Sequence, residues 1–381
     1  MSLRGFTLGL VCFSLFACGG SDDAAPASGA GGSAGMAGAA GAAGGSSCPA
    51  GSHAVGSECV STLAAWSSGP SLSGSRDHHV TFVVDSKYLY AAGGVRDMKT
   101  PLSSVERSAI ASDGSLGPWE AATQLPEASV GAGLGQVGDT IVVAGGIRIS
   151  GNSGAPSTRT DVGHASADGS VSWSVGPELS VSRFHAAAVA VGAHVFVIGG
   201  LTGAGTDNTP AVERAEVQAD GSVGAWQMAK ELPEKRSHQS VAATEDAIYV
   251  VGGLTGDPAG VHTTFSDVLR ATVSADGSLG DWTTVGSLPV PLATHSSLIH
   301  LGYLYVLGGV EGNPPSEQNT AAVRRAKIEA DGSVGEWESL ESLPKARAHC
   351  HQTPLVNGII YSVAGAFEHA SMTDVFLGTL E

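Results

Sequence analysis

The sequence predicts an all-β protein in which six similar units of four antiparallel strands close into a ring. Three repeating features predict it. The phrase SDGSLGPWEAATQLP (112–126) is one of five similar copies, six tryptophans recur along the chain, and six hydrophobic runs end in glycine. The tryptophans and the glycines both advance by 52 to 56 residues. A period near 50 residues indicates a repeat architecture in which each repeat is one supersecondary unit.

The composition favours short strands and turns. The chain has 381 residues, 54 of them glycine, and only 14% are charged, which does not suit long surface helices. Its formal net charge is −17. Nucleic-acid binding depends on clustered basic residues, so nucleic acid is excluded as an expected partner.

Each unit can be assigned strand by strand. The first strand is apolar or small throughout, as in HVTFVV (79–84), which suits a strand buried on both faces. The second is rich in β-branched and aromatic residues and ends at the glycines, as in YLYAAGG (88–94). A third strand precedes Asp-Gly, a strong hairpin signal, and the fourth carries the tryptophan. The Asp-Gly hairpins begin at Asp113, Asp168, Asp220, Asp276 and Asp331.

Five hairpins against six tryptophans indicate that one unit is split. Residues 372–381 resemble a third strand without a fourth, and residues 63–72, with Trp66, resemble a fourth strand without a third. Pairing these two segments completes the sixth unit, closes the ring and leaves only short protected strand edges.

Residues 61–381 resemble the kelch-repeat β-propellers, on the six glycine-terminated runs and the six downstream tryptophans. The resemblance implies a six-bladed kelch-type β-propeller with four antiparallel strands per blade. All six tyrosines fall in second strands. They are therefore predicted to be core residues, not ligands for the copper chemistry known on some kelch propellers.

Two arginine series accompany the repeats. Arg107, Arg214, Arg270 and Arg325 lie six residues before the hairpin Asp or its equivalent, and the tryptophan lies six after it. We therefore expect each arginine to stack on the tryptophan across the hairpin.

The second series is the candidate ligand-binding site. Arg and His stand ten and twelve residues after the tryptophan in four blades: Arg76 and His78, Arg183 and His185, Arg236 and His238, Arg347 and His349. A spacing of two places both side chains on one side of an extended strand. They enter the first strand on the face that carries the variable loops, where function concentrates. The alternative is that these residues satisfy backbone groups between blades.

No hydrolase or phosphate-binding motif occurs in the chain, and His349-Cys350-His351 is disfavoured as a metal site because Cys350 would point away from both histidines in a strand. No catalytic residue, metal or cofactor is predicted. The expected function is a monomeric binding or scaffolding module for a protein or an acidic glycan. The alternative is a carbohydrate-active enzyme like the periplasmic sialic-acid mutarotases, which share the six-bladed kelch ring.

The N-terminal segment predicts export. Residues 1–17 hold Arg4 and an apolar run too short to span a bilayer. Leu15-Phe16-Ala17-Cys18 resembles the lipobox of bacterial lipoproteins, which implies lipid on Cys18 and anchoring in the cell envelope; a secreted protein with an incidental Cys18 is the alternative. Gly19 suggests the outer membrane or cell surface.

The segment that follows is expected to separate the propeller from the membrane. Residues 18–47 are Gly, Ala and Ser-rich and should form a disordered tether. Cys48 and Cys59 bound a small loop (48–60) and are predicted to form a disulfide in an exported chain. A two-cysteine metal clip is the disfavoured alternative.

Overall fold

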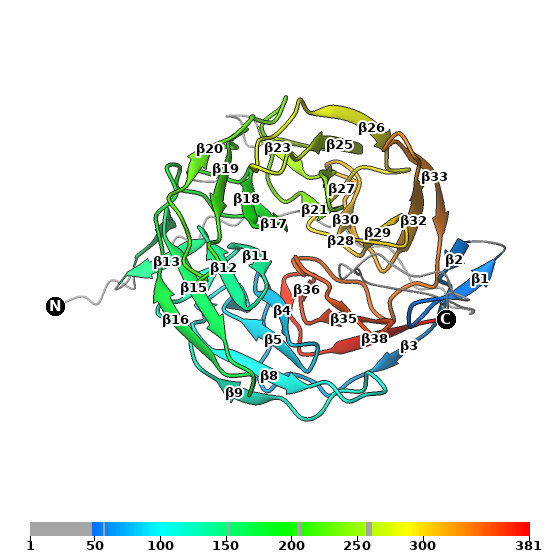
Figure 1. Ribbon diagram of the computed structural model, residues 1–381, viewed down its shortest axis with the longest axis horizontal. Helices are drawn as coiled ribbons and strands as arrows, with labels where there is room; N and C mark the ends of the chain where they lie inside the picture. The colour runs from blue at the N-terminus through cyan, green and yellow to red at the C-terminus, as the bar shows by residue number, and fades with distance from the viewer. Residues whose placement is uncertain (1–47, 56–57, 151–152, 204–206, 257–260) are drawn as a thin grey trace.

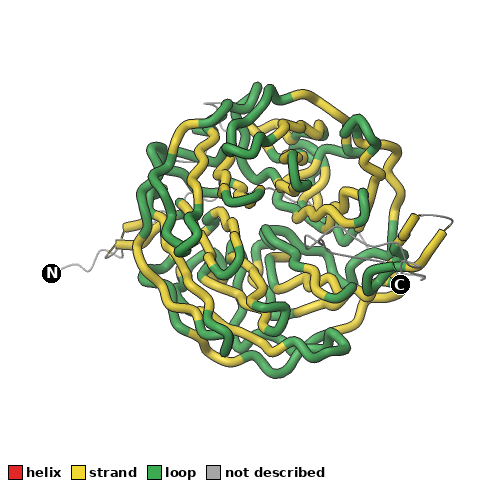
Figure 2. The backbone as a smooth tube through the Cα atoms, viewed as in Figure 1, coloured by secondary structure: helices red, strands yellow, loops and turns green. Residues whose placement is uncertain are grey.

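The computed structural model describes residues 48–55, 58–150, 153–203, 207–256 and 261–381. The predicted signal peptide (1–17), Cys18 and the tether lie outside these residues. The described part consists of strands and loops (Figure 2), and it contains no helix that could span a membrane. Its sheets stand around a common axis, which Figure 1 views end-on.

Within the described residues there are six four-stranded antiparallel sheets, one for each predicted blade. The first, innermost strands are β4 (Val80–Val84), β11 (Gly133–Val137), β17 (Ala187–Val191), β21 (Ser240–Ala243), β28 (Ser296–His300) and β34 (Leu355–Val356). The second are β5 (Tyr88–Ala92), β12 (Thr140–Ala144), β18 (His194–Ile198), β22 (Ala247–Val251), β29 (Tyr303–Leu307) and β35 (Ile359–Val363). The third are β8 (Val105–Ala109), β15 (Thr160–Ala165), β19 (Val212–Glu216), β25 (Asp267–Thr272), β32 (Val323–Ile328) and β38 (Val375–Leu380). The fourth, outermost strands are β9 (Glu120–Ala122), β16 (Val171–Val175), β20 (Gln227–Met228), β26 (Thr283–Ser287), β33 (Val334–Ser339) and β3 (Leu63–Ser68).

The sixth blade is built from both ends of the described chain. Strand β3 pairs antiparallel with β38, with Trp66 opposite Gly378, and β38 pairs with β35. The backbones of Thr62 and Glu381 also exchange two hydrogen bonds. This is the predicted pairing of residues 63–72 with 372–381, with somewhat shorter strands. Figure 1 shows β3 in blue beside β38 in red.

Short accessory strands occupy the loops between second and third strands and the entries to first strands. They are β6 (Val95–Arg96) with β7 (Thr100–Pro101), β10 (Ser129–Val130) with β13 (Ile147–Ser150) and β14 (Ser153–Pro156), β23 (Leu254–Gly256) with β24 (His262–Thr264), β27 (Leu292–Ala293) with β30 (Val310–Glu311) and β31 (Gln318–Asn319), and β36 (Ala366–Phe367) with β37 (Ala370–Ser371). Within the described residues, the variable loops of five blades therefore contain short paired strands.

A further hairpin precedes the propeller. Strand β1 (His53–Val55) pairs with β2 (Glu58–Val60). Cys48 and Cys59 form the predicted disulfide, with their Cα atoms 5.5 Å apart. Cys350 is free and buried.

The core lies between neighbouring sheets. Second strands are almost completely buried, and their residues pack against the inner strands of adjacent blades; Tyr90, for example, shares a cluster with Leu134 of β11 and with Ile141 and Val143 of β12. Tyr90, Tyr249, Tyr305 and Tyr361 are at most 1% exposed, as expected of core residues, whereas Tyr88 and Tyr303 are only partly buried at the edge of the core. The glycine that ends a second strand is sterically required: Gly94 has a φ of +90°, and a Cβ there would lie 2.4 Å from the Asp77 carbonyl oxygen.

The repeated tryptophans join neighbouring blades at the outer rim. Each indole N–H donates to a carbonyl or loop group of the preceding blade; Trp119 reaches Pro70, Trp282 reaches Lys230 and Trp66 reaches Glu341. The last of these bonds links blade five to the split blade six. The tryptophans therefore act around the whole circumference, including the closure.

The predicted stacking of the outer arginines on tryptophans is wrong. Trp337 stands opposite Ala326, one position beyond Arg325, so the two side chains project to opposite faces of the sheet. Three of the four arginines lie instead over second-strand tyrosines: Arg107 over Tyr88, Arg270 over Tyr249 and Arg325 over Tyr303. The fourth, Arg214, donates to the carbonyl oxygen of Asp276. The prediction failed because a register of one residue reverses the face.

Candidate functional site

Six backbone positions form a closed hydrogen-bonded ring around the axis. One residue at the entry to each first strand donates its N–H to the carbonyl of the equivalent residue in the preceding blade, at 2.8–3.1 Å. All six have a positive φ, between +49° and +64°. The members of this axial ring are His78, Gly131, His185, His238, Thr294 and His349.

The four histidines of the axial ring bring their side chains together at the axis. The ring centroids of His78 and His349 are 3.9 Å apart, and those of His185 and His238 are also 3.9 Å apart. His78 and His185 lie 4.8 Å apart. The four histidines therefore lie together at the axis.

A fifth histidine completes the cluster. The His351 ring lies 5.9–6.2 Å from the rings of His78, His185 and His349. Sequence reasoning missed its place at the axis, because it lies two residues beyond the repeated position and has no counterpart at that position in the other blades.

Burial penalises the charged form of four of these imidazoles, those of His185, His238, His349 and His351. Burial, reinforced by the neighbouring imidazoles, holds the pKa of His185, His238 and His349 well below the ordinary value. The pKa of His351 falls to about 3 for the same reasons. An anion contact through imidazolium below about pH 6.5 is therefore not favoured at these four histidines.

The four arginines of the same series do not face the axis. Each is at most 1% exposed and binds groups of its own sheet. Arg183 donates to the carbonyl oxygens of Gly199 and Ala211 and pairs with Glu213 at 2.7 Å. Arg76 pairs with Glu106 and Arg236 with Asp267 in the same manner, and Arg347 donates to the carbonyl oxygens of Ser362, Ala364 and Asp374.

These contacts favour a structural role for Arg76, Arg183, Arg236 and Arg347, but within a blade, not between blades. Blade two shows the same need met differently: Ser129 stands at the arginine position, and Arg148 from β13 binds the Gly145 carbonyl and Asp161 instead. The common requirement is a buried cation that satisfies carbonyl oxygens beside the glycine doublet.

The arginine and histidine separate because the chain is not extended between them. The left-handed conformation at the axial-ring position turns the backbone, so a spacing of two no longer places both side chains on one side. The arginine turns into its blade and the histidine turns to the axis.

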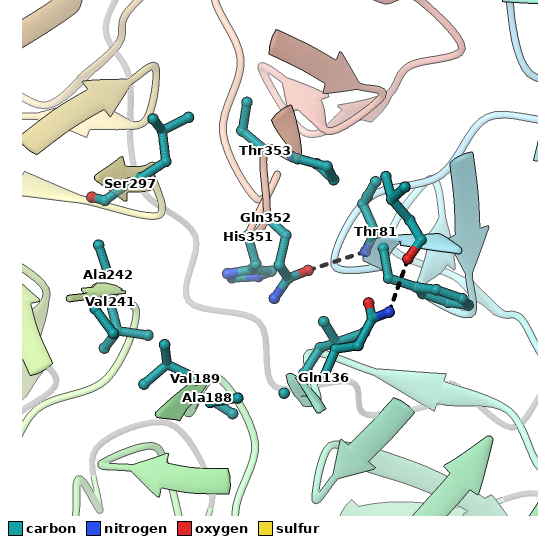
Figure 3. A pocket seen from close by; sticks show the side chains of 18 of the residues that line it. Thr81, Gln136, Ala188, Val189, Val241, Ala242, Ser297, His351, Gln352 and Thr353 are labelled. Carbon is teal, nitrogen blue, oxygen red and sulfur yellow. Dashed lines mark hydrogen bonds between the residues drawn. The ribbon is translucent and has the colours of Figure 1, made fainter. Parts of the chain in front are cut away.

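A channel of about 580 Å³ begins beside the axial ring. First-strand residues of all six blades line it, from Gln239 and His351 near the ring to Asp85 and Asp139 at the turns between first and second strands. It therefore extends toward the face with short turns, opposite the variable loops where we expected the site. Figure 3 shows His351, Gln352, Thr81 and Gln136 around it, with Ala188, Val189, Val241 and Ala242 on the other side.

The channel is lined by small and apolar side chains, among which stand a few uncharged polar groups in its depth. Asp85 and Asp139, at the mouth, are exposed, and Asp85 pairs with Lys87. Deeper inside, Gln239 Oε1, Ser240 Oγ, Ser297 Oγ and His351 Nε2 are buried atoms without a hydrogen-bond partner among the described residues. No arginine is among the described residues that line the channel.

Comparison with known proteins agrees with this architecture. No family model matches the chain. A segment of the chain is 27% identical over 188 residues to the Kelch repeat and BTB domain-containing protein 1 of Camelpox virus, covering 49% of this chain and 28% of that protein. Beta-scruin of Limulus polyphemus is 25% identical over 186 residues, covering 47% of this chain and 18% of its own length. The Kelch-like protein terF of Aspergillus terreus is 25% identical over 188 residues, covering 46% and 39%.

A solved structure, "Structure of YjhT", superposes with a TM-score of 0.63 at 13% identity, over 82% of this chain and 99% of that one. The fold is a kelch-type β-propeller. The chain spans well under half the length of these curated relatives, so their similarity supports the repeat and the fold.

The observed site differs from the predicted one mainly in the residues that form it. The histidines lie where several blades meet, and the channel groups come from first strands whose sequences vary among blades. Gln239, Ser240 and Ser297 carry no repeated signal, since each contributes from a different position of its strand. A repeat pattern in the sequence identifies only residues that recur at the same position in each blade.

Proposed function

We propose that this protein is a binding module of the cell envelope, anchored by lipid on Cys18, whose axial channel receives an uncharged polar group of a glycan or protein partner. The kelch-repeat similarity supports a binding role in general. The channel chemistry supports the nature of the ligand, and the lipobox-like segment supports the location.

The observation that carries the proposal is the set of unsatisfied polar atoms in a neutral channel. A volume of about 580 Å³ falls in the range of small-ligand sites, roughly 300–1,000 Å³. Gln239 Oε1, Ser240 Oγ and Ser297 Oγ lack partners among the described residues, and a buried polar atom gains free energy when a ligand supplies one. Sugar hydroxyls or an uncharged side chain would satisfy them.

A carboxylate ligand, which the sequence suggested, suits the channel less well. The nearby arginines already pair with carboxylates of their own blades. The mouth of the channel carries Asp85 and Asp139. An anion would meet these carboxylates before reaching any cation. We therefore favour a neutral glycan over an acidic one.

The enzyme alternative, of the sialic-acid mutarotase type, would need an acid and a base beside the substrate. Among the described lining residues, the titratable group in the depth of the channel is His351, whose pKa of about 3 lies far from the range useful for proton transfer near neutral pH. Binding accounts for this channel better than catalysis.

Channel blocking tests the site. Ala187 lines the channel, is half-buried and lies on β17, so Ala187→Trp should fill part of it. We expect neutral oligosaccharides on a glycan array to bind the wild type and to lose at least tenfold in affinity to Ala187→Trp, measured by calorimetry. The matched control is Ala121→Trp, on the exposed outer strand β9.

Three outcomes would contradict the proposed site. They are preferential binding of acidic glycans, equal binding by both variants at an unchanged melting temperature, and absence of glycan binding together with a protein partner held only through the variable loops.

The location is tested separately. Cys18→Ser should move the protein from the membrane fraction to the soluble fraction of the cell envelope, because a thioether-linked lipid can no longer be attached. Equal fractionation of wild type and Cys18→Ser would refute the anchor and leave the binding proposal standing.

A further inference from the structure

We propose that His78, His185 and His349 bind one divalent transition-metal ion on the propeller axis. Each of the three offers one nitrogen, and these atoms all lie within 4.8 Å of one another. They come from blades one, three and six, so only the closed ring assembles them. The site goes beyond the proposed channel binding and does not depend on it.

The nitrogens are available as ligands. Buried, neutral imidazole is the form that coordinates a metal. Nδ1 of His78 donates to Oδ1 of the buried Asp77, whose other oxygen accepts from Ser371. A carboxylate bound to one ring nitrogen fixes the tautomer and directs the other nitrogen to a metal. Nε2 of His78 is thereby left as the atom that would coordinate the metal ion.

His185 and His349 contribute nitrogens with no competing bond. Nδ1 of His185 and Nδ1 of His349 are buried and lack a hydrogen-bond partner among the described residues. His185 is 7% exposed, and a Cβ on Gly131 would lie 3.1 Å from its Nδ1, so the glycine of blade two leaves the space beside this nitrogen open. His238 differs, because its Nδ1 already bonds Ser237 Oγ at 2.8 Å.

The backbone gives an independent reason to ask what the histidines do. His78, His185, His238 and His349 have φ values of +49° to +57°, a conformation that costs free energy for a residue with a side chain. Blade two fills the same position with Gly131 at φ +64°. Blade five fills it with Thr294 at φ +59°, so the axial ring forms without histidine and does not itself require the imidazoles.

Three imidazoles select the class of ion. Nitrogen ligands suit Zn²⁺, Co²⁺, Ni²⁺ and Cu²⁺, whereas Mg²⁺ and Ca²⁺ prefer oxygen. Tetrahedral binding at about 2.0–2.1 Å places ligand nitrogens roughly 3.3 Å apart, so the rings would draw together by about 1–1.5 Å. Three protein ligands leave a fourth position, and the ring of His351, which lines the channel, lies 5.9 Å from that of His78.

The test titrates the tag-free mature chain, stripped by a chelator, with Zn²⁺ and with Co²⁺. We expect one ion per chain by calorimetry, visible absorption bands of tetrahedral Co²⁺, and a melting temperature that rises with free Zn²⁺. His185→Gly and His349→Gly should each weaken binding by more than about 100-fold. Asp77→Asn should weaken it by about 10–100-fold, as expected for the loss of an orienting carboxylate.

Glycine is the informative substitution because the chain already uses it at Gly131. The metal-free glycine variants should melt no lower than the metal-free wild type, which separates loss of a ligand from unfolding. His238→Gly makes the same backbone change and should retain the ion. His164→Ala, on β15 near the rim, controls for adventitious histidine sites.

Each opposite result would overturn the proposal. These results are no bound ion at micromolar concentrations, unchanged binding in His185→Gly and His349→Gly, or equal loss in His238→Gly and His185→Gly. Loss of glycan binding without loss of the ion would affect only the channel proposal.

Discussion

The axis and the rim of this propeller treat their polar groups in opposite ways. At the rim, tryptophan N–H groups and tyrosine hydroxyls bind carbonyls of neighbouring blades; Trp337 reaches Ser287 and Tyr361 reaches Gly114 of the next blade's hairpin. At the axis, imidazole nitrogens and channel hydroxyls are buried without partners among the described residues. Paired groups stabilise the ring, and the unpaired ones are the groups left to bind something else.

Removal of the closing strand β3 should have the largest effect on the stability of the propeller, because it opens the ring at blade six. Deletion of residues 61–73 removes β3 and Trp66, exposes the edge of β38 and takes away the Trp66 bond to Glu341. We expect loss of cooperative unfolding for the whole propeller, measured by calorimetry and circular dichroism.

Deletion of residues 19–47 is the control, since it leaves every described contact in place. It should leave the melting temperature unchanged. If the two deletions melt alike, β3 does not close the ring.

Arg183→Ala should have the second largest effect on stability, because it leaves a buried charge without its partner. Glu213 is fully buried and pairs with Arg183 at 2.7 Å. Loss of one member of a buried pair costs about 3–5 kcal/mol, which urea unfolding can measure. The exposed pair between Lys87 and Asp85 offers a comparison, and Lys87→Ala should leave the free energy of unfolding close to that of the wild type.

This result sharpens the distinction between the two repeated series. A normal free energy of unfolding for Arg183→Ala, with loss of ligand binding, would return Arg183 to the binding site. A large loss of stability would confirm that it supports the blade.

The smallest expected effect on stability is that of the outer arginines on third strands. Arg270 lies over Tyr249 and donates from Nε to its hydroxyl at 3.1 Å, while the Trp282 indole bonds Lys230. In double-mutant cycles, Arg270→Ala and Tyr249→Phe should couple by about 0.5–1 kcal/mol. Arg270→Ala and Trp282→Phe should add. Coupling to Trp282 instead of Tyr249 would reinstate the stacking that the register excludes.

The repeats predicted the fold closely and the site only in part. Gly94 and its counterparts end second strands because their backbone conformation and crowding demand glycine, so they are visible in sequence. Trp66, isolated from any Asp-Gly hairpin, predicted the split blade correctly. Both are local requirements that recur once per blade.

The site depends on features that do not recur. The direction of Arg183 depends on the left-handed backbone at His185, and a histidine does not by itself indicate a positive φ. The place of His351 depends on six first strands meeting at an axis. The buried Asp77 beside His78 is paired with Ser371, 294 residues away in the chain, and no spacing in the sequence links them.

The axial ring also bears on how such a molecule can change its size. Each blade contributes one N–H and one carbonyl to it, and every bond runs in the same rotational sense. A duplicated repeat inserted anywhere would bring its own donor and acceptor, so the count would stay balanced. The inner bonds therefore do not determine the number of blades. Growth or loss of a repeat is limited instead by the seam between β3 and β38, which can close only when the accumulated rotation of the sheets returns the chain to its own beginning.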